Sequence, residues 1–166
     1  MRHVKYFAIL IFLSFFIFGC ASKNEVAKSY SVLVTFKTEK LSFRDTGFLK
    51  SGRDFLDLEV FAVGKPIAKI SILKGSDRIC LNKYCFNKKV FNEEYLSRYY
   101  PDSLLENVLR GRAVFGGKNR VETRDGFYQN LKEKGKYDIK YRVENGKILF
   151  KDRLNRIIIG LKPLKM

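Results

Sequence analysis

Apolar and polar residues alternate along most of the chain, which is the pattern of strands that bury one face. The first run covers residues 30–37, with apolar side chains at the even-numbered positions. The alternation returns at residues 56–60, 68–72 and 139–143, and residues 157–159 form a last apolar run. Each of these runs predicts a β-strand.

Turn signals separate these runs. Asn145-Gly146 lies between two apolar segments and is a strong hairpin signal, because both residues accept the positive φ of a type I′ turn. Further turns are predicted at Gly47, Gly52, Gly64-Lys65-Pro66, Lys74-Gly75-Ser76-Asp77 and Gly116-Gly117.

One interruption of the strand pattern predicts two short helices. Asn92 is expected to cap the first, with Glu93 and Glu94 in its first turn, and residues 101–103 begin a second that ends at Gly111. Short amphipathic helices between two blocks of strands predict a mainly β fold, in which a curved antiparallel sheet forms an incomplete barrel covered by helices. Such a sheet is able to enclose a cavity.

The N-terminus has the pattern of a lipoprotein signal peptide. Arg2, His3 and Lys5 form a basic start, and the apolar residues 6–18 are too few to span the roughly 30 Å hydrocarbon layer as an untilted helix. A glycine then precedes Cys20, which we expect to become the lipidated first residue of the mature protein, carrying palmitate among its acyl chains. The alternative is an uncleaved N-terminal anchor with an incidental cysteine.

This assignment divides the chain into a signal peptide (1–19), an acylated tether (20–29) and a single half-barrel domain (30–166). Each methylene that enters a bilayer adds about 0.8 kcal/mol, so two or more acyl chains on Cys20 give stable membrane anchoring. Ala21, in place of Asp after the cysteine, predicts sorting to the outer membrane. We therefore expect a lipid-anchored protein on the periplasmic side of that membrane.

The net positive charge of the chain indicates which partners to expect. The chain has 33 Lys and Arg against 17 Asp and Glu, and a formal net charge of +16 at pH 7. Such a surface favours anionic lipid headgroups, lipopolysaccharide or an acidic protein. Nucleic acid is not expected as a partner of an exported lipoprotein. The alternative is that the scattered Lys and Arg side chains only solvate the outer faces of strands, because no run of five or more basic residues occurs.

Cys80 and Cys85 flank the sequence Leu-Asn-Lys-Tyr, which we interpret as the four-residue tip of a β-hairpin. In an oxidising envelope the pair is predicted to form a disulfide worth about 2 kcal/mol. Its spacing fits neither a thioredoxin-type redox pair nor a zinc knuckle. A structural role is therefore expected.

Catalytic chemistry is not apparent. His3 is the only histidine and leaves with the signal peptide, so the mature chain has no histidine for a Ser/His/Asp site, a Cys/His site or a metal. Asp57 and Glu59 alternate with apolar residues on a strand and are expected on its solvent face. No Gly-rich phosphate loop is found. We expect no enzyme, cofactor or metal, and a hydrolase is disfavoured.

Three segments carry a resemblance to a known family: LDLEVFAVGKPIAKISILKGSDRICL, DSLLENVLRGR and YDIKYRVENGKILFKDRLNRIIIGLK. In their order and apolar pattern they resemble LolB, the outer-membrane lipoproteins that receive other lipoproteins from a periplasmic carrier. The resemblance covers most of residues 30–162 and implies a LolA/LolB-like fold. Two departures are the absence of Trp, which the family usually has where Val108 stands and in the last strand, and the high positive charge.

The resemblance implies a monomer that takes the acyl chains of a cargo lipoprotein from the carrier, shields them in an apolar cavity and helps to insert them into the outer membrane. It would act as a chaperone in lipoprotein localisation. We expect the cavity to be lined by Val32, Val34, Phe36, Leu58, Val60, Ile70, Ile72, Leu96, Leu105, Val108, Leu109, Tyr141 and Val143. An ordinary solid core is the alternative for each of these residues.

The segment at residues 61–66 matches a protruding loop of the LolB family whose exposed apolar residue helps deliver cargo to the membrane. Val63 occupies the matching position, and Lys65 and Lys69 are expected to draw the loop to anionic headgroups. The runner-up function is a non-enzymatic envelope scaffold or assembly lipoprotein. It would bind anionic lipid, lipopolysaccharide or protein through its basic surface.

Overall fold

Strands form most of the protein. The computed structural model describes residues 26–164, so the predicted signal peptide and the predicted lipidation site Cys20 lie outside the described residues. The strands are β1 (Val26–Lys37), β2 (Ser42–Gly52), β3 (Phe55–Ala62), β4 (Lys65–Leu73), β5 (Arg78–Leu81), β6 (Tyr84–Asn87), β7 (Arg120–Thr123), β8 (Gly126–Glu133), β9 (Tyr137–Glu144), β10 (Lys147–Asp152) and β11 (Ile157–Pro163). Two helices, α2 (Lys88–Tyr95) and α3 (Leu104–Leu109), and the 3₁₀ turn η2 (Phe115–Gly117) connect the two blocks of strands.

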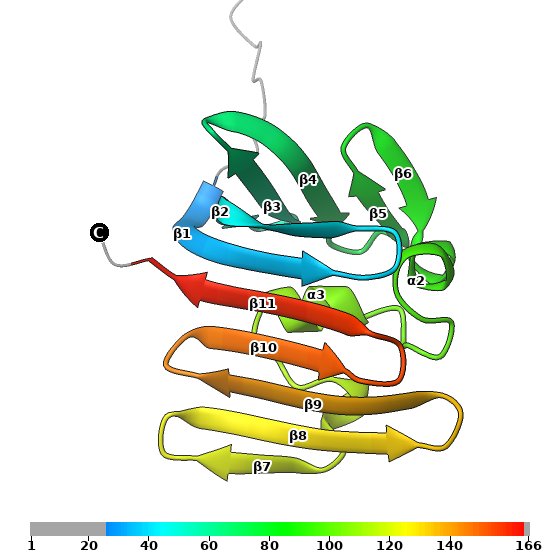
Figure 1. Cartoon of the computed structure of the whole chain (residues 1–166). Helices are drawn as coiled ribbons and strands as arrows, with labels where there is room; N and C mark the ends of the chain where they lie inside the picture. The colour runs from blue at the N-terminus through cyan, green and yellow to red at the C-terminus, as the bar shows by residue number, and fades with distance from the viewer. Residues whose placement is uncertain (1–25, 165–166) are drawn as a thin grey trace, which may run out of the picture.

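All eleven strands belong to one antiparallel sheet with the order β6-β5-β4-β3-β2-β1-β11-β10-β9-β8-β7. The pairing of β1 with β11 joins the two blocks, with Phe36 opposite Ile159. Strands β6 and β7 are the two edges, so the sheet is not closed. Figure 1 shows β7–β11 side by side, β3–β6 turned at an angle to them, and α3 across the middle of one face. The predicted mainly β architecture of an unclosed antiparallel sheet with a few short helices is confirmed.

The core lies on the face of the sheet that α3 covers. The even-numbered positions of β1 point inward as predicted, and Val34 and Phe36 are fully buried. The short α3 is held by its apolar side, because Leu104, Leu105, Val108 and Leu109 are all fully buried. At this size most helical stability comes from such packing, since an isolated six-residue helix is unstable in water.

The predicted start of the first helix is wrong. The N-cap is Asn87, whose side chain accepts a hydrogen bond of 2.9 Å from the backbone N–H of Lys89. Asn87 also ends β6 and has the extended backbone that a cap requires. Asn92 instead lies inside α2, is buried, and donates from Nδ2 to the carbonyl of Pro101 at 3.1 Å. It therefore anchors the connection between α2 and α3.

The turn predicted at Gly47 is also wrong, because this residue lies inside β2. A Cβ at this position would stand 2.3 Å from the carbonyl oxygen of Glu59 on β3. Glycine is needed there because the two backbones approach closely. The Asn145-Gly146 hairpin is confirmed, with φ of 49° and 73°. Among the residues that the structure describes, no helix is long and apolar enough to cross a membrane.

Candidate functional site

The inner face of the sheet is hollow at one end. A cavity of about 610 Å³ lies where β1 begins and β11 ends, beneath the C-terminal end of α3. Its size falls within the range of about 300–1,000 Å³ typical of small-molecule sites. The strands supply most of its apolar wall: Val32, Leu49, Leu56, Val143, Ile148 and Leu161.

Strand pairing brings these wall residues together. Ile148 stands opposite Val143 on β9 and opposite Leu161 on β11, so the three share the inner face in one row. Leu161 in turn stands opposite Val34 of β1. The wall therefore runs across the junction between the two blocks of the sheet.

The last turn of α3 covers the cavity. Gly111 has φ of 64°, its N–H donates to the carbonyl of Val108 at 3.0 Å, and the N–H of Arg112 donates to the carbonyl of Asn107 at 2.8 Å. These two bonds are a Schellman motif, in which glycine takes the left-handed conformation that ends a helix. Gly111 also approaches the wall closely, since an added Cβ would lie 3.3 Å from Ile148 and 3.4 Å from Val143.

Buried side chains hold the segment that follows α3. The Tyr141 hydroxyl donates to the carbonyl of Arg112 at 3.0 Å, and burial raises the pKa of this phenol, so it stays neutral. Gln129 is fully buried and bonds both backbone groups of Val114, accepting at 2.8 Å and donating at 3.0 Å. The cover of the cavity is therefore fixed to β8 and β9.

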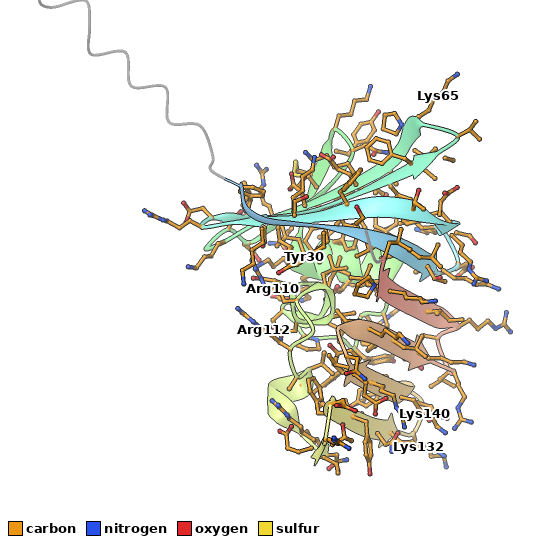
Figure 2. The ribbon with its side chains drawn as sticks, turned by 90° about the vertical axis from the view of Figure 1, so that its left-hand side faces the viewer. Tyr30, Lys65, Arg110, Arg112, Lys132 and Lys140 are labelled. Carbon is orange, nitrogen blue, oxygen red and sulfur yellow. A yellow bond between two sulfur atoms is a disulfide. The ribbon has the colours of Figure 1, made fainter. Side chains whose placement is uncertain are left out.

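Basic side chains surround the mouth of the cavity. Lys28 and Arg112 are exposed, and Arg110 is half-buried, with Nε 3.1 Å from Oε1 of Glu106. Figure 2 shows Tyr30, Arg110 and Arg112 near one another on the same side of the molecule. The site thus combines an apolar wall with a positively charged rim.

The structure places three of the thirteen predicted lining residues at this cavity: Val32, Leu109 and Val143. Leu96 is half-buried and packs on the core from the end of α2. The other nine are buried among one another in the filled part of the core: Val34, Phe36, Leu58, Val60, Ile70, Ile72, Leu105, Val108 and Tyr141.

Several lining residues were not predicted. Leu49 lies on β2, a strand whose pattern is irregular in sequence. Ile148 lies in the apolar segment after the predicted Asn145-Gly146 turn, where its register opposite Val143 would have identified it. Leu161, which stands opposite Ile148, lies two residues beyond the predicted last strand. The basic rim, by contrast, is assembled from β1 and the end of α3, which are far apart in the sequence.

The β3–β4 hairpin carries a second candidate surface. Val63 and Gly64 form its two-residue tip, and Val63 is completely exposed, with φ of 49°. Behind the tip, the rings of Phe48 and Phe61 meet with centroids 5.8 Å apart and, with Val63, border a hollow of about 330 Å³. Figure 2 shows Lys65 at the tip of this hairpin, next to Gly64.

Lys69, which was expected to draw the loop to headgroups, forms local ion pairs. Its Nζ lies 2.9 Å from Asp57 and 3.2 Å from Glu59, and the bond to Asp57 raises the pKa of Lys69. These three residues are cross-strand neighbours on the solvent face, so their charges compensate locally. Lys65 remains as the basic residue beside the exposed Val63.

The predicted disulfide between Cys80 and Cys85 is confirmed. The two residues stand directly opposite each other on β5 and β6, with Cα atoms 3.9 Å apart. The hairpin tip is shorter than predicted and consists of Asn82 and Lys83, because Leu81 already pairs with Tyr84.

Asp152 is a buried carboxylate outside the cavity, and its hydrogen bonds explain why it is buried. Asp152 is 1% exposed and accepts hydrogen bonds from the Tyr100 hydroxyl at 2.6 Å, the Asp138 N–H at 3.0 Å and the Leu154 N–H at 3.0 Å. Asn155 donates a further bond of 2.6 Å from its side chain. Because its lone pairs are satisfied, Asp152 holds the turn after β10 and is not a candidate acid or base.

Comparison of the chain with protein-family models, with curated proteins and with solved structures finds no match. Within residues 26–164, no group of three or more His, Cys, Asp or Glu side chains has the arrangement of a metal site. The candidate functional surfaces are therefore the cavity, its basic rim and the exposed β3–β4 hairpin.

Proposed function

We propose that the protein is a membrane-anchored lipoprotein of the LolB type, which holds acyl chains of other lipoproteins and helps to insert them into the outer membrane. The observation that carries the proposal is the cavity of about 610 Å³, walled by apolar side chains and set between an unclosed sheet and α3. A concave apolar wall of this size suits hydrocarbon chains.

The cost of exposing acyl chains to water explains why a shielded site is needed. An acyl chain gains about 0.8 kcal/mol for every methylene that leaves water, so a cargo lipoprotein needs a shielded site at each step between carrier and bilayer. Transfer without an energy source requires each site to bind the chains more tightly than the one before. A cavity that opens at the surface, with Tyr30 half exposed at its mouth, allows chains to enter and leave.

Two further features support the proposal. Strand β1 begins at Val26, and Lys28 and Tyr30 of this strand line the mouth, so the chain that carries Cys20 joins the domain beside the cavity. The exposed Val63 and the adjacent Lys65 form a tip with one apolar and one basic side chain. Such a tip suits contact with a bilayer surface during release.

The test is transfer of a purified acylated lipoprotein from its periplasmic carrier to the protein, measured by co-isolation. Val143→Glu places a charge on the cavity wall and should block transfer, because burying a carboxylate against hydrocarbon costs several kcal/mol. Lys140→Glu is the matched control, since residue 140 is on the same strand β9 but faces solvent.

Folding of both variants is checked by circular dichroism. Val143 is half-buried at an open site, so its replacement is expected to leave the fold intact, and Leu49→Glu provides a second variant at an equally half-buried wall position. Normal transfer by both folded cavity variants would refute the proposal.

One observation favours the scaffold function as a second candidate. On the outer face, Lys140 stands directly opposite Lys151, a like-charge pair that costs stability. Arg142, the next residue along that face, borders the same hollow as both lysines. Figure 2 shows Lys132 and Lys140 together on this side of the sheet. If Lys140→Glu stops transfer while Val143→Glu does not, the basic outer face is the functional surface.

A further inference from the structure

We infer that the cavity selects an acyl chain with a negatively charged head, which is held at the mouth by Lys28, Arg110 and Arg112. This inference rests on the proposed function, because it requires the cavity to accept an acyl chain. It adds a ligand class that the acylated cysteine of a lipoprotein, which has no charged head, does not supply: an acyl chain with a carboxylate or a phosphate head.

The three cations approach the mouth from two sides. Lys28 projects from β1, whereas Arg110 and Arg112 flank Gly111 at the end of α3. The Schellman motif fixes their spacing, and the hydrogen bond from Tyr141 to the carbonyl of Arg112 ties this segment to β9. The positive rim is therefore held by the fold, although its side chains reach into solvent.

Their charge is only partly compensated. Glu106 pairs with Arg110 at 3.1 Å, and Lys88 lies 3.9 Å from the same carboxylate. Among the described residues, neither Lys28 nor Arg112 forms an ion pair. Uncompensated cations beside an apolar cavity repel one another, and a bound anion removes that repulsion.

The ligand chemistry follows from this combination. A guanidinium group presents paired N–H donors that match the oxygens of a carboxylate or phosphate. Ser51 adds a hydroxyl to the same lining. The tail of such a ligand meets the apolar wall while its head meets the cations, as complementarity requires.

The absence of Trp from the chain supplies a clean reporter. In Tyr30→Trp the single indole stands at the mouth of the cavity, and in Tyr128→Trp it stands on the outer face as a control for partition into the bilayer. The full chain is placed in phosphatidylcholine vesicles and titrated with dibromostearate, with dibromostearyl alcohol, which has the same tail and a neutral head, or with a brominated lysophosphatidate.

The expected result is quenching of the Tyr30→Trp indole at about tenfold lower concentration of the anionic ligands than of the alcohol. Lys28→Glu combined with Arg112→Glu should remove this preference, so that the acid and the alcohol quench at similar concentrations. Arg112→Gln should reduce the preference in part, and Lys140→Glu should preserve it. The stronger of the two anionic ligands identifies the head as carboxylate or phosphate.

Three results would overturn the inference. Equal quenching by acid and alcohol, unaffected by charge reversal, would leave the acyl-chain cavity intact but remove its selectivity. If no ligand quenches the Tyr30→Trp indole more than the Tyr128→Trp indole, the cavity does not bind acyl chains. That result would refute the proposed function as well. The third is a lower denaturation midpoint of the charge-reversed variant together with equal quenching by anionic and neutral ligands in the wild-type background. That result would assign the cations only a structural role in stabilising α3.

Discussion

Replacing Gly111 by Ala tests whether the end of α3 shapes the cavity. The residue has φ of 64°, a conformation that costs an L-residue with a Cβ about 1–2 kcal/mol. The lower entropy of the unfolded Ala chain returns about 0.4–1 kcal/mol. The new methyl group would also lie 3.3 Å from Ile148 and 3.4 Å from Val143, and such crowding costs about 1 kcal/mol where the neighbours are flexible side chains. The net loss should be about 2 kcal/mol.

Gly116→Ala is the matched control. It has the same φ of 64°, but an added Cβ has no atom within 4 Å, so only the backbone cost of about 1 kcal/mol remains. Urea denaturation of the full chain gives both free energies of unfolding. Because Ile148 and Val143 line the cavity, Gly111→Ala should also weaken acyl-chain binding, whereas Gly116→Ala should not. Equal costs for the two variants, with equal binding, would show that the contact of Gly111 with the wall has no consequence.

Three more predictions concern the anchor and the stability of the domain. Cys20→Ser should abolish incorporation of labelled palmitate, and labelled variant protein would exclude the lipoprotein assignment. Reduction of the Cys80–Cys85 disulfide should lower the free energy of unfolding by about 2 kcal/mol in urea titrations, and free thiols at both positions in envelope protein would contradict its formation in the cell. Tyr100→Phe removes the 2.6 Å bond to the buried Asp152 and should cost about 1.5–3 kcal/mol by the same titration, so an unchanged midpoint would show that this bond contributes nothing.

The strands that could be predicted are those with an uninterrupted apolar face, such as residues 30–37 and 68–72. Strand β2 was not predicted, because its inner face includes Gly47 and Asp45, which stand opposite Val32 and Val34 of β1. Strand β8 was not predicted, because its inward-facing residue 129 is a glutamine. The Gln129 side chain forms hydrogen bonds with the backbone of Val114, after α3. In both strands a local structural requirement replaces an apolar residue and hides the period of two.

The cavity could be predicted only in part. Alternation shows which residues face inward, but it does not show whether side chains from α3 fill the space they face. Leu105 and Val108 of α3 are buried over the middle of the sheet, so most predicted lining residues lie in a filled core. The hollow remains where α3 ends, near Val32 and Val143, and that position depends on the tertiary packing of the helix.

The most direct test of the acyl-chain cavity is native mass spectrometry of the full chain extracted from membranes, compared with Leu49→Trp, which fills the cavity with a larger side chain. We expect one non-covalently bound acyl lipid on the wild-type protein and little or none on the filled variant. Equal lipid content in both proteins, or none in either, would contradict it.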